Sequence, residues 1–283
     1  MKILEAITFL EKRLKKLAFV SNSNIEAKFL LEKILDCSAL DFSQFYDQEL
    51  SAQQCILLNN FIVARENKEP IAYITQLQAF WKYEFKVNDA VLIPRSDSET
   101  LIEAVLTNIK NPKDSFKLLD LGVGSGCLTI SLMLELVNST AVGLDISADA
   151  LIVAKNNIDQ YRLQDRITLQ KSDWFEKLSS LDKFDIIISN PPYISITEIN
   201  VMSEETLIYE PHIALFAEDK GLENYKIIAN HAKNFLKING RIYLEIGFNQ
   251  AKSVKKIFTD KGYIFVNSYK DLGDIERCLE FKI

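Results

Sequence analysis

The most specific candidate for chemistry is Asn190-Pro191-Pro192-Tyr193, which directly follows an apolar segment, residues 184–189. Each proline restricts φ and lacks an N–H donor, so the turn is stiff and its carbonyl groups point in set directions. The turn also offers the amide oxygen of Asn190 and the flat ring of Tyr193. A rigid loop with an exposed tyrosine is the alternative, but it gives no reason for an asparagine before two prolines.

These groups suit a reaction at a planar nitrogen. The lone pair of an amide or aromatic amine is delocalised, so attack on an electrophilic methyl group requires the nitrogen to become tetrahedral. Its N–H groups are then stronger donors, and the Asn190 oxygen and the Pro191 carbonyl can accept them in the transition state. Asn190 and Tyr193 are therefore the candidate catalytic residues, with Tyr193 as a stacking surface. Asn190, Pro191, Pro192 and Tyr193 together form the candidate substrate site.

A glycine loop, Gly122-Val123-Gly124-Ser125-Gly126, follows the apolar segment 118–121, which contains Asp120. The pattern G-x-G-x-G differs from the dinucleotide fingerprint G-x-G-x-x-G, which would need a glycine at Cys127. It is typical of class I methyltransferases, and the alternative is a tight turn without a ligand. The loop predicts a site for S-adenosylmethionine.

Two further residues fit that ligand. Asp145 ends the next apolar segment, where a carboxylate can accept hydrogen bonds from both ribose hydroxyls; its alternative role is to cap a helix starting near Ser147. Trp174 follows Asp173 after a third segment and could stack on the purine; its alternative role is to pack the edge of the core. The glycine loop, Asp145 and Trp174 are therefore the candidate cofactor-binding residues.

The strands and helices that must position these residues form an α/β domain. From residue 97 onward, expected strands alternate with helical patterns; they lie at 117–121, 141–145, 167–170, 185–189, 241–246 and 263–269. Such alternation predicts a parallel sheet with helices on both faces. The preceding region reads as three helices, with apolar stripes from Ile3 to Ala18 and capping patterns at Ser23-x-x-Glu26 and Ser51-x-x-Gln54. An aromatic hairpin is expected near 80–87.

Further segments match one family in order along the chain. They are Glu69-Pro70-Ile71-Ala72-Tyr73-Ile74, Val91-Leu92-Ile93-Pro94-Arg95-Ser96-Asp97-Ser98-Glu99, Ser172-Asp173-Trp174-Phe175, Tyr209-Glu210-Pro211, Leu244-Glu245-Ile246-Gly247 and Asp271-Leu272-Gly273. With the glycine loop and Asn-Pro-Pro-Tyr, the chain resembles the release factor glutamine methyltransferase family (PrmC, also called HemK) from about residue 69 onward. It departs from that family at Ser96 (usually Pro), at Ser98 (usually Thr) and in residues 215–221, which lack paired glycines.

The resemblance implies a Rossmann-like, seven-stranded class I methyltransferase domain at 97–283, preceded by a helical bundle at 1–75 and a β-hairpin linker at 76–96. Recognition of the protein substrate by the bundle is a hypothesis that rests only on its attachment to this domain. It implies methylation of the side-chain amide nitrogen (N5) of the glutamine in the Gly-Gly-Gln motif of class 1 peptide-chain release factors. S-adenosylmethionine would be the methyl donor and S-adenosylhomocysteine the product. The cofactor-binding residues that the resemblance implies are Gly122, Val123, Gly124, Ser125, Gly126, Asp145, Trp174 and Asn190.

Composition restricts the other classes of function. The chain has 283 residues, a net charge of −6, two histidines and four scattered cysteines, which gives no metal-ligand spacing. No apolar run is long enough to span a membrane and no signal peptide is recognised, so a cytoplasmic location is expected. Two alternatives remain, an adenine-N6 methyltransferase of DNA or RNA and a non-enzymatic binding module. The acidic charge disfavours a nucleic-acid substrate.

Overall fold

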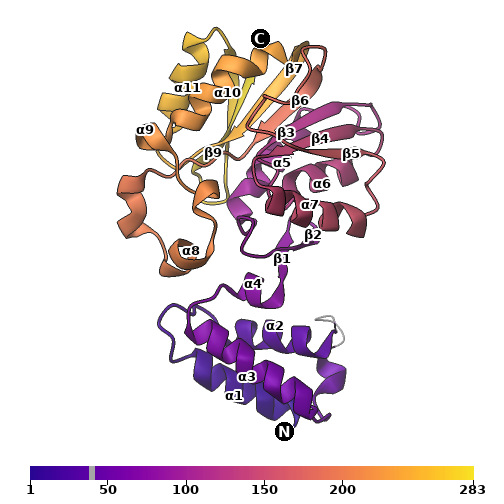
Figure 1. Cartoon of the computed structure of the whole chain (residues 1–283), viewed down its shortest axis with the longest axis vertical. Coiled ribbons are helices and arrows are strands. Elements are labelled where there is room, and N and C mark those ends of the chain that lie inside the picture. The colour runs from indigo at the N-terminus through magenta and orange to yellow at the C-terminus, as the bar shows by residue number, and fades with distance from the viewer. Residues whose placement is uncertain (38–41) are drawn as a thin grey trace. The chain divides into compact units, whose positions relative to one another are not determined.

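The computed structural model describes residues 1–37 and 42–283 and divides the chain into two compact units (Figure 1). One unit comprises Met1–Leu77 together with Ser203–Tyr209. The other comprises Gln78–Met202 and Glu210–Ile283. The first unit is helical, and the second contains the sheet. None of the described helices is long and apolar enough to cross a membrane.

The first unit is built on three amphipathic helices, α1 (Ile3–Leu14), α2 (Ser23–Leu35) and α3 (Ala52–Glu66), followed by the short helix α4 (Ile71–Thr75). The expected capping box of α3 is confirmed, since Ser51 and Gln54 bond each other's backbone N–H groups. The cap of α2 is Asn22 and not Ser23, because the Asn22 side chain accepts from the backbone of Ile25.

A buried arginine organises one edge of this unit. The Arg65 side chain is 3% exposed; its Nε donates to Glu26 at 2.7 Å and its Nη1 donates to Glu205 at 2.5 Å. Lys68 pairs with Glu204 alongside. Glu204 and Glu205 begin helix α8 (Glu204–Tyr209), so ion pairs hold this distant segment of sequence against α3. A buried arginine needs such partners, because an uncompensated charge is expensive away from water.

The expected hairpin consists of β1 (Leu77–Phe80) and β2 (Tyr83–Lys86), and all of it except Leu77 belongs to the second unit. This unit also contains a seven-stranded sheet of order β5-β4-β3-β6-β7-β9-β8. Every pairing from β5 to β7 is parallel, whereas β9 is antiparallel to both neighbours. The strands are β3 (Lys117–Leu121), β4 (Thr140–Asp145), β5 (Ile167–Lys171), β6 (Phe184–Ser189), β7 (Leu236–Glu245), β8 (Ile264–Lys270) and β9 (Glu276–Lys282).

Alternation along the strands divides the core into two layers. Leu119 and Ile187 point to one face with residues of α10 (Glu223–His231) and α11 (Ala251–Asp260). Leu118 and Ile186 point to the other face, with residues of α5 (Glu99–Thr107), α6 (Cys127–Glu135) and α7 (Ala148–Gln160). Figure 1 shows these two helical layers on either side of the sheet. Both faces are covered, as a parallel sheet requires.

The six strands expected from the sequence are all present, with ends that differ by a few residues. Strand β9 was not predicted, because its sequence Glu-Arg-Cys-Leu-Glu-Phe-Lys mixes charged with apolar residues. Its charged side chains find partners within the unit: Glu280 pairs with Arg241 at 3.0 Å, and Arg277 pairs with Asp97 at 2.8 Å. The seven-stranded architecture implied by the family resemblance is confirmed.

Candidate active site

The glycine loop and the Asn190 segment meet because of the strand order. The chain crosses from β3 to β4 and β5 on one side, and then returns to place β6 on the other side of β3. Leu121 and Ser189, the last residues of β3 and β6, are paired in register. The following residues, Gly122 and Asn190, therefore emerge side by side at the switch point, where open α/β sheets bind ligands.

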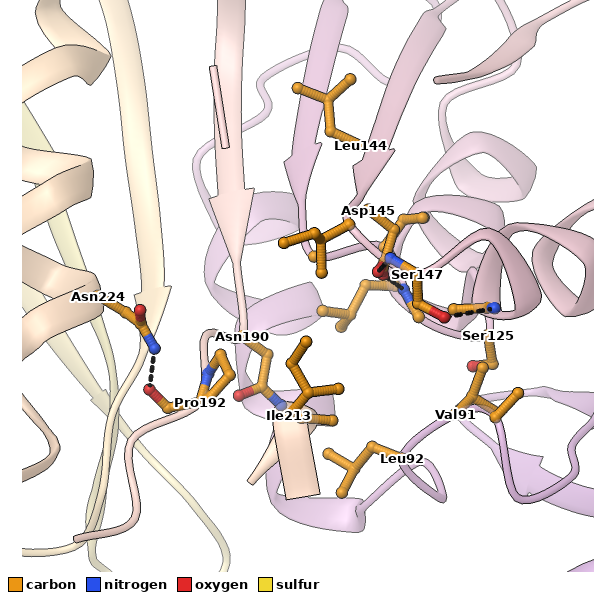
Figure 2. A pocket seen from close by; sticks show the side chains of 18 of the residues that line it. Val91, Leu92, Ser125, Leu144, Asp145, Ser147, Asn190, Pro192, Ile213 and Asn224 are labelled. Atoms are coloured by element: carbon orange, nitrogen blue, oxygen red, sulfur yellow. Dashed lines mark hydrogen bonds between the residues drawn. The ribbon is translucent and has the colours of Figure 1, made fainter. Parts of the chain in front are cut away.

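A cavity of about 300 Å³ lies at this edge of the sheet. Figure 2 shows Asp145 and Ser147 on one side of it and Asn190, Pro192 and Asn224 on the other. All eight expected cofactor-binding residues lie at β-strand ends or in the loops that follow them, and seven of the eight line the cavity. The expected residues on its wall, including those of the substrate site, are Gly122, Val123, Gly124, Ser125, Asp145, Trp174, Asn190 and Pro192.

Gly126 is the one expected cofactor-binding residue that does not line the cavity. Gly126 instead begins α6 with φ +81°, and a Cβ there would meet Ile130 at 3.1 Å. At Gly122, by contrast, nothing lies within 4 Å of the position that a Cβ would take, and φ is +79°. The loop thus presents bare backbone to the cavity, as close approach of a ligand requires.

Asp145 closes the glycine loop from the β4 side. Its Oδ2 accepts from the Gly124 N–H and its Oδ1 from the Ser147 N–H, both at 2.9 Å. Ser147, and not Asp145, is the N-cap of α7, because its hydroxyl accepts from Ala150. Burial raises the pKa of Asp145, and the backbone bonds oppose that rise. Each carboxylate oxygen keeps acceptor capacity for a ligand hydroxyl.

Asn157, which the sequence analysis did not single out, supports the loop from behind. This fully buried side chain on α7 donates to the carbonyls of Ser125 and Lys86 at 2.8 and 2.9 Å and accepts from the Lys86 N–H at 2.8 Å. One amide therefore joins the glycine loop to strand β2. These contacts are long-range, so no local pattern could reveal them.

Truncation of Asn157 to alanine should weaken both the fold and the donor site, because one buried and two part-buried backbone groups lose their partner. At about 1–3 kcal/mol for each unsatisfied group, partly relieved by relaxation, the free energy of unfolding should fall by about 2–4 kcal/mol. Urea unfolding measures this loss, and Asn156→Ala on the exposed face of the same helix is the matched control. Equal stability of the two variants would contradict this assignment.

Asp120 lies beneath the glycine loop as a buried carboxyl. It is 1% exposed, its Oδ2 accepts from Thr129 at 2.5 Å, and its Oδ1 has no partner among the described residues. Burial raises the pKa of Asp120 to about 7, and the Thr129 bond opposes that rise. The folded protein therefore keeps this proton at pH values where an unfolded chain has released it.

A pH dependence of stability follows from this raised pKa. Below the unfolded pKa of 3.8 both states are protonated, and stability falls as pH rises toward the folded pKa of about 7. Asp120→Asn removes this dependence, so it should gain on the order of 2 kcal/mol relative to the wild type between pH 5 and pH 8. Denaturant midpoints at the two pH values measure the gain, with exposed Asp149→Asn as control. A pH-independent difference would refute the raised pKa.

The Asn190 segment is held by side chains from three other elements. Asn190 donates from Nδ2 to Ser98 at 3.2 Å, and the carbonyls of Pro192 and Tyr193 accept from Asn224 at 2.8 Å and Gln250 at 2.9 Å. Figure 2 shows the Asn224 bond. Within the described chain, Asn190 Oδ1 and the Pro191 carbonyl receive no hydrogen bond, so both are available as acceptors.

The structure separates Tyr193 and Pro191 from the cavity wall, which Asn190 and Pro192 line. The Tyr193 ring packs against the core, and its hydroxyl donates to Glu245 at 3.2 Å. Burial raises the pKa of Tyr193, and the nearby Glu245 charge adds to the rise. Tyr193 is half-buried, and its role as a stacking surface stays a prediction.

Residues 210–216 form another wall of the cavity through Ile213, Ala214 and Phe216. Glu210 anchors this segment, since its buried carboxylate accepts from the Ile93 N–H at 3.1 Å and pairs with Arg95. The segments around Pro94-Arg95 and Glu210-Pro211 therefore contact each other in the folded protein. Their separation in sequence, more than a hundred residues, hid this contact from the sequence analysis.

Comparison with known proteins shows which class of protein has this fold. The model of a family described as a methyltransferase domain matches residues 112–275, and a model described as the PrmC N-terminal domain matches residues 5–75. A methyltransferase from Pyrococcus furiosus superposes with a TM-score of 0.52 at 17% identity, over 83% of this chain and 100% of that one. The hMettl16 catalytic domain, solved with an RNA hairpin, gives 0.57 at 14% identity, over 91% and 90%. The fold is that of a methyltransferase.

Relatives in sequence show which family of methyltransferases the chain belongs to. The release factor glutamine methyltransferase of Francisella tularensis is 35% identical over 94% of both chains, and that of Caulobacter vibrioides is 34% identical over 98% of this chain and 95% of its own. The chain belongs to the release factor glutamine methyltransferase family. A bifunctional methyltransferase of Rickettsia typhi is 43% identical over 90% of this chain, which spans about half (52%) of that relative.

Proposed function

We propose that this protein transfers a methyl group from S-adenosylmethionine to the side-chain amide nitrogen (N5) of the glutamine in the Gly-Gly-Gln motif of class 1 peptide-chain release factors. Family membership supports this reaction. The observation that carries it is the hydrogen-bonded state of Asn190, whose Nδ2 is held by Ser98 while its Oδ1 and the Pro191 carbonyl stay available. Two acceptors would match the two hydrogens of a primary amide.

The cavity suits the donor. Bare backbone at Gly122 faces open space, and the Asp145 carboxylate stands beside it, which fits an adenosine ribose. Trp174 lines the same cavity and offers a ring for the purine. The donor, when bound, supplies an electrophilic methyl on a positively charged sulfur. We propose Gly122, Val123, Gly124, Ser125, Gly126, Asp145, Trp174 and Asn190 as the donor-binding residues, with Gly126 acting through the shape of the loop.

The chain's own residues then act mainly by orientation. Asn190 Oδ1 and the Pro191 carbonyl accept the glutamine N–H groups, which turns the nitrogen lone pair toward the methyl group. These bonds strengthen as the nitrogen becomes tetrahedral, so they favour the transition state over the bound substrate. Tyr193 supports the flat amide. The proton leaves after transfer, so no strong base is required in the site.

Mass spectrometry of a release factor after incubation with the protein and the donor tests this function. A gain of one methyl group on the Gly-Gly-Gln glutamine is expected, and Gln→Ala in that motif should abolish it. Transfer to DNA or RNA and not to the release factor would overturn the proposal in favour of an adenine-N6 methyltransferase. Absence of donor binding in calorimetry would instead favour a non-enzymatic binding module. Because the proposed substrate is a translation factor, we also propose that the reaction takes place in the cytoplasm.

We further propose that the helical unit recognises the protein substrate away from the glutamine. Deletion of residues 1–75 should then raise KM for a whole release factor more than for a short Gly-Gly-Gln peptide. The deletion also leaves Glu204 and Glu205 without their partners Lys68 and Arg65. Both glutamates are therefore replaced by glutamine in the deletion variant, and the same two replacements are made in a full-length control. Equal changes in KM for the two substrates would exclude this role.

A further inference from the structure

Which end of the Asn190 amide faces the cavity decides whether the proposed reaction is possible. The two ends of an asparagine amide are similar in shape, so neighbouring donors and acceptors determine the orientation. With Oδ1 toward the substrate, Asn190 accepts an N–H. With Nδ2 toward the substrate, two N–H donors would oppose each other. The neighbours of Asn190 therefore control its chemistry.

The first of these neighbours is Ser98. It belongs to the short 3₁₀ turn Ser96–Ser98, is 3% exposed, and accepts from Asn190 Nδ2 at 3.2 Å. A hydroxyl has a single hydrogen and can therefore donate only one bond. If that hydrogen is directed elsewhere, Ser98 can offer Asn190 only a lone pair, and only the Nδ2 end of the amide can satisfy it.

Glu245 provides the place for that hydrogen. It is the last residue of β7 and is 2% exposed; its Oε1 accepts from Tyr193, while its Oε2 is buried without a close partner in the described chain. Burial raises the pKa of Glu245 to about 7, and side-chain hydrogen bonding with Ser98 and Tyr193 opposes that rise. A buried acceptor without a partner calls for a donor. Ser98 carries the hydroxyl whose interaction with Glu245 lowers the pKa of this carboxyl, and we take it as that donor.

We propose that Ser98 and Glu245 are positioning residues, which orient the Asn190 amide with Oδ1 toward the substrate nitrogen. Glu245 accepts the Ser98 hydrogen, Ser98 accepts from Asn190 Nδ2, and Asn190 Oδ1 is left for the substrate. The same carboxyl holds the Tyr193 hydroxyl, so one buried residue sets both side chains of the substrate site. This inference rests on the proposed function, since it assigns a purpose to the Asn190 acceptor.

The chain offers a graded set of variants. Ser98→Ala removes the acceptor, and kcat should fall at least about tenfold while the Kd for S-adenosylmethionine stays within about twofold. Ser98→Thr keeps the hydroxyl and should retain kcat. Glu245→Gln places an N–H donor beside Ser98, which reverses the order of donors, so kcat should fall as in Ser98→Ala. Ser96→Ala removes an exposed hydroxyl from the same turn and is the matched control.

A second measurement needs no activity. The side-chain amide of Asn190 gives a pair of ¹⁵N-correlated proton signals, which Asn190→Asp identifies by their loss. In the protein without donor, Ser98→Ala and Glu245→Gln should shift this pair, and Ser98→Thr should leave it nearly in place. Thermal unfolding of each variant identifies any general loss of fold.

The outcomes separate the two proposals. A wild-type protein that methylates no release factor contradicts the proposed function, and the amide signals still test the orientation. Wild-type kcat in Ser98→Ala, or Asn190 signals that do not respond to Ser98 or Glu245, would overturn the positioning role while leaving the function intact. A loss of kcat that Ser98→Thr shares with Ser98→Ala would also overturn it.

Discussion

Replacement of Asn190 by alanine should lower kcat for glutamine methylation by about 10²–10³-fold, the effect of removing one preorganised hydrogen-bonding group from a transition state. The donor Kd should change far less, because Asn190 forms only one part of the cavity wall opposite Asp145. Asn190→Asp keeps the oxygen acceptors but loses the N–H to Ser98, so its kcat should lie between those of the wild type and Asn190→Ala. Single-turnover kinetics with saturating donor measures these rates.

The control for this prediction is Asn249→Ala, an exposed asparagine near Gln250 in the same unit. It should show wild-type kcat. If Asn190→Ala retained more than about a tenth of the wild-type rate, Asn190 would not be the acceptor that stabilises the transition state, and the mechanism would need another group.

Replacement of Asp145 by alanine should weaken binding of S-adenosylmethionine by about 100-fold. Hydrogen bonds to a charged group contribute about 1.5–3 kcal/mol each, and each 1.4 kcal/mol is tenfold in Kd. The loss has two sources: the ribose hydroxyls lose their acceptor, and the Gly124 and Ser147 N–H groups lose theirs. Isothermal titration calorimetry measures the change directly.

Asp149→Asn, an exposed carboxylate in the first turn of α7, is the control for Asp145. It should bind the donor as the wild type does. A Kd unchanged in Asp145→Ala would remove Asp145 from the donor site and return it to the role of a carboxylate that only supports the glycine loop.

The sequence was sufficient for the elements that local patterns describe. Apolar periodicity located the helices and the strands of the parallel sheet, and the spacing of glycine loop and Asp145 indicated the edge where they meet. Asp145 and Asn190 do face each other across one cavity, as expected from strand ends in a parallel sheet. These features depend on residues close together in the chain, or on the simple geometry of strand order.

The residues that the sequence analysis missed act across long separations. Asn157 bonds Lys86 from 71 residues away, Ser98 bonds Asn190 from 92, and Asn224 bonds Pro192 from 32. No periodicity marks a buried polar residue whose partner lies on another element. Strand β9 was missed for a related reason, because its glutamate and arginine are tolerated through partners supplied by other segments.

The ion pairs of Arg65 have an evolutionary consequence. Because the helical unit includes Ser203–Tyr209 as well as Met1–Leu77, one recombination breakpoint in the gene cannot transfer it whole. A new N-terminal segment would meet Glu204 and Glu205 with charges selected for a different partner. Substitutions at residues 65 and 205 should therefore occur together among relatives, with loss of the arginine accompanied by loss of the glutamate.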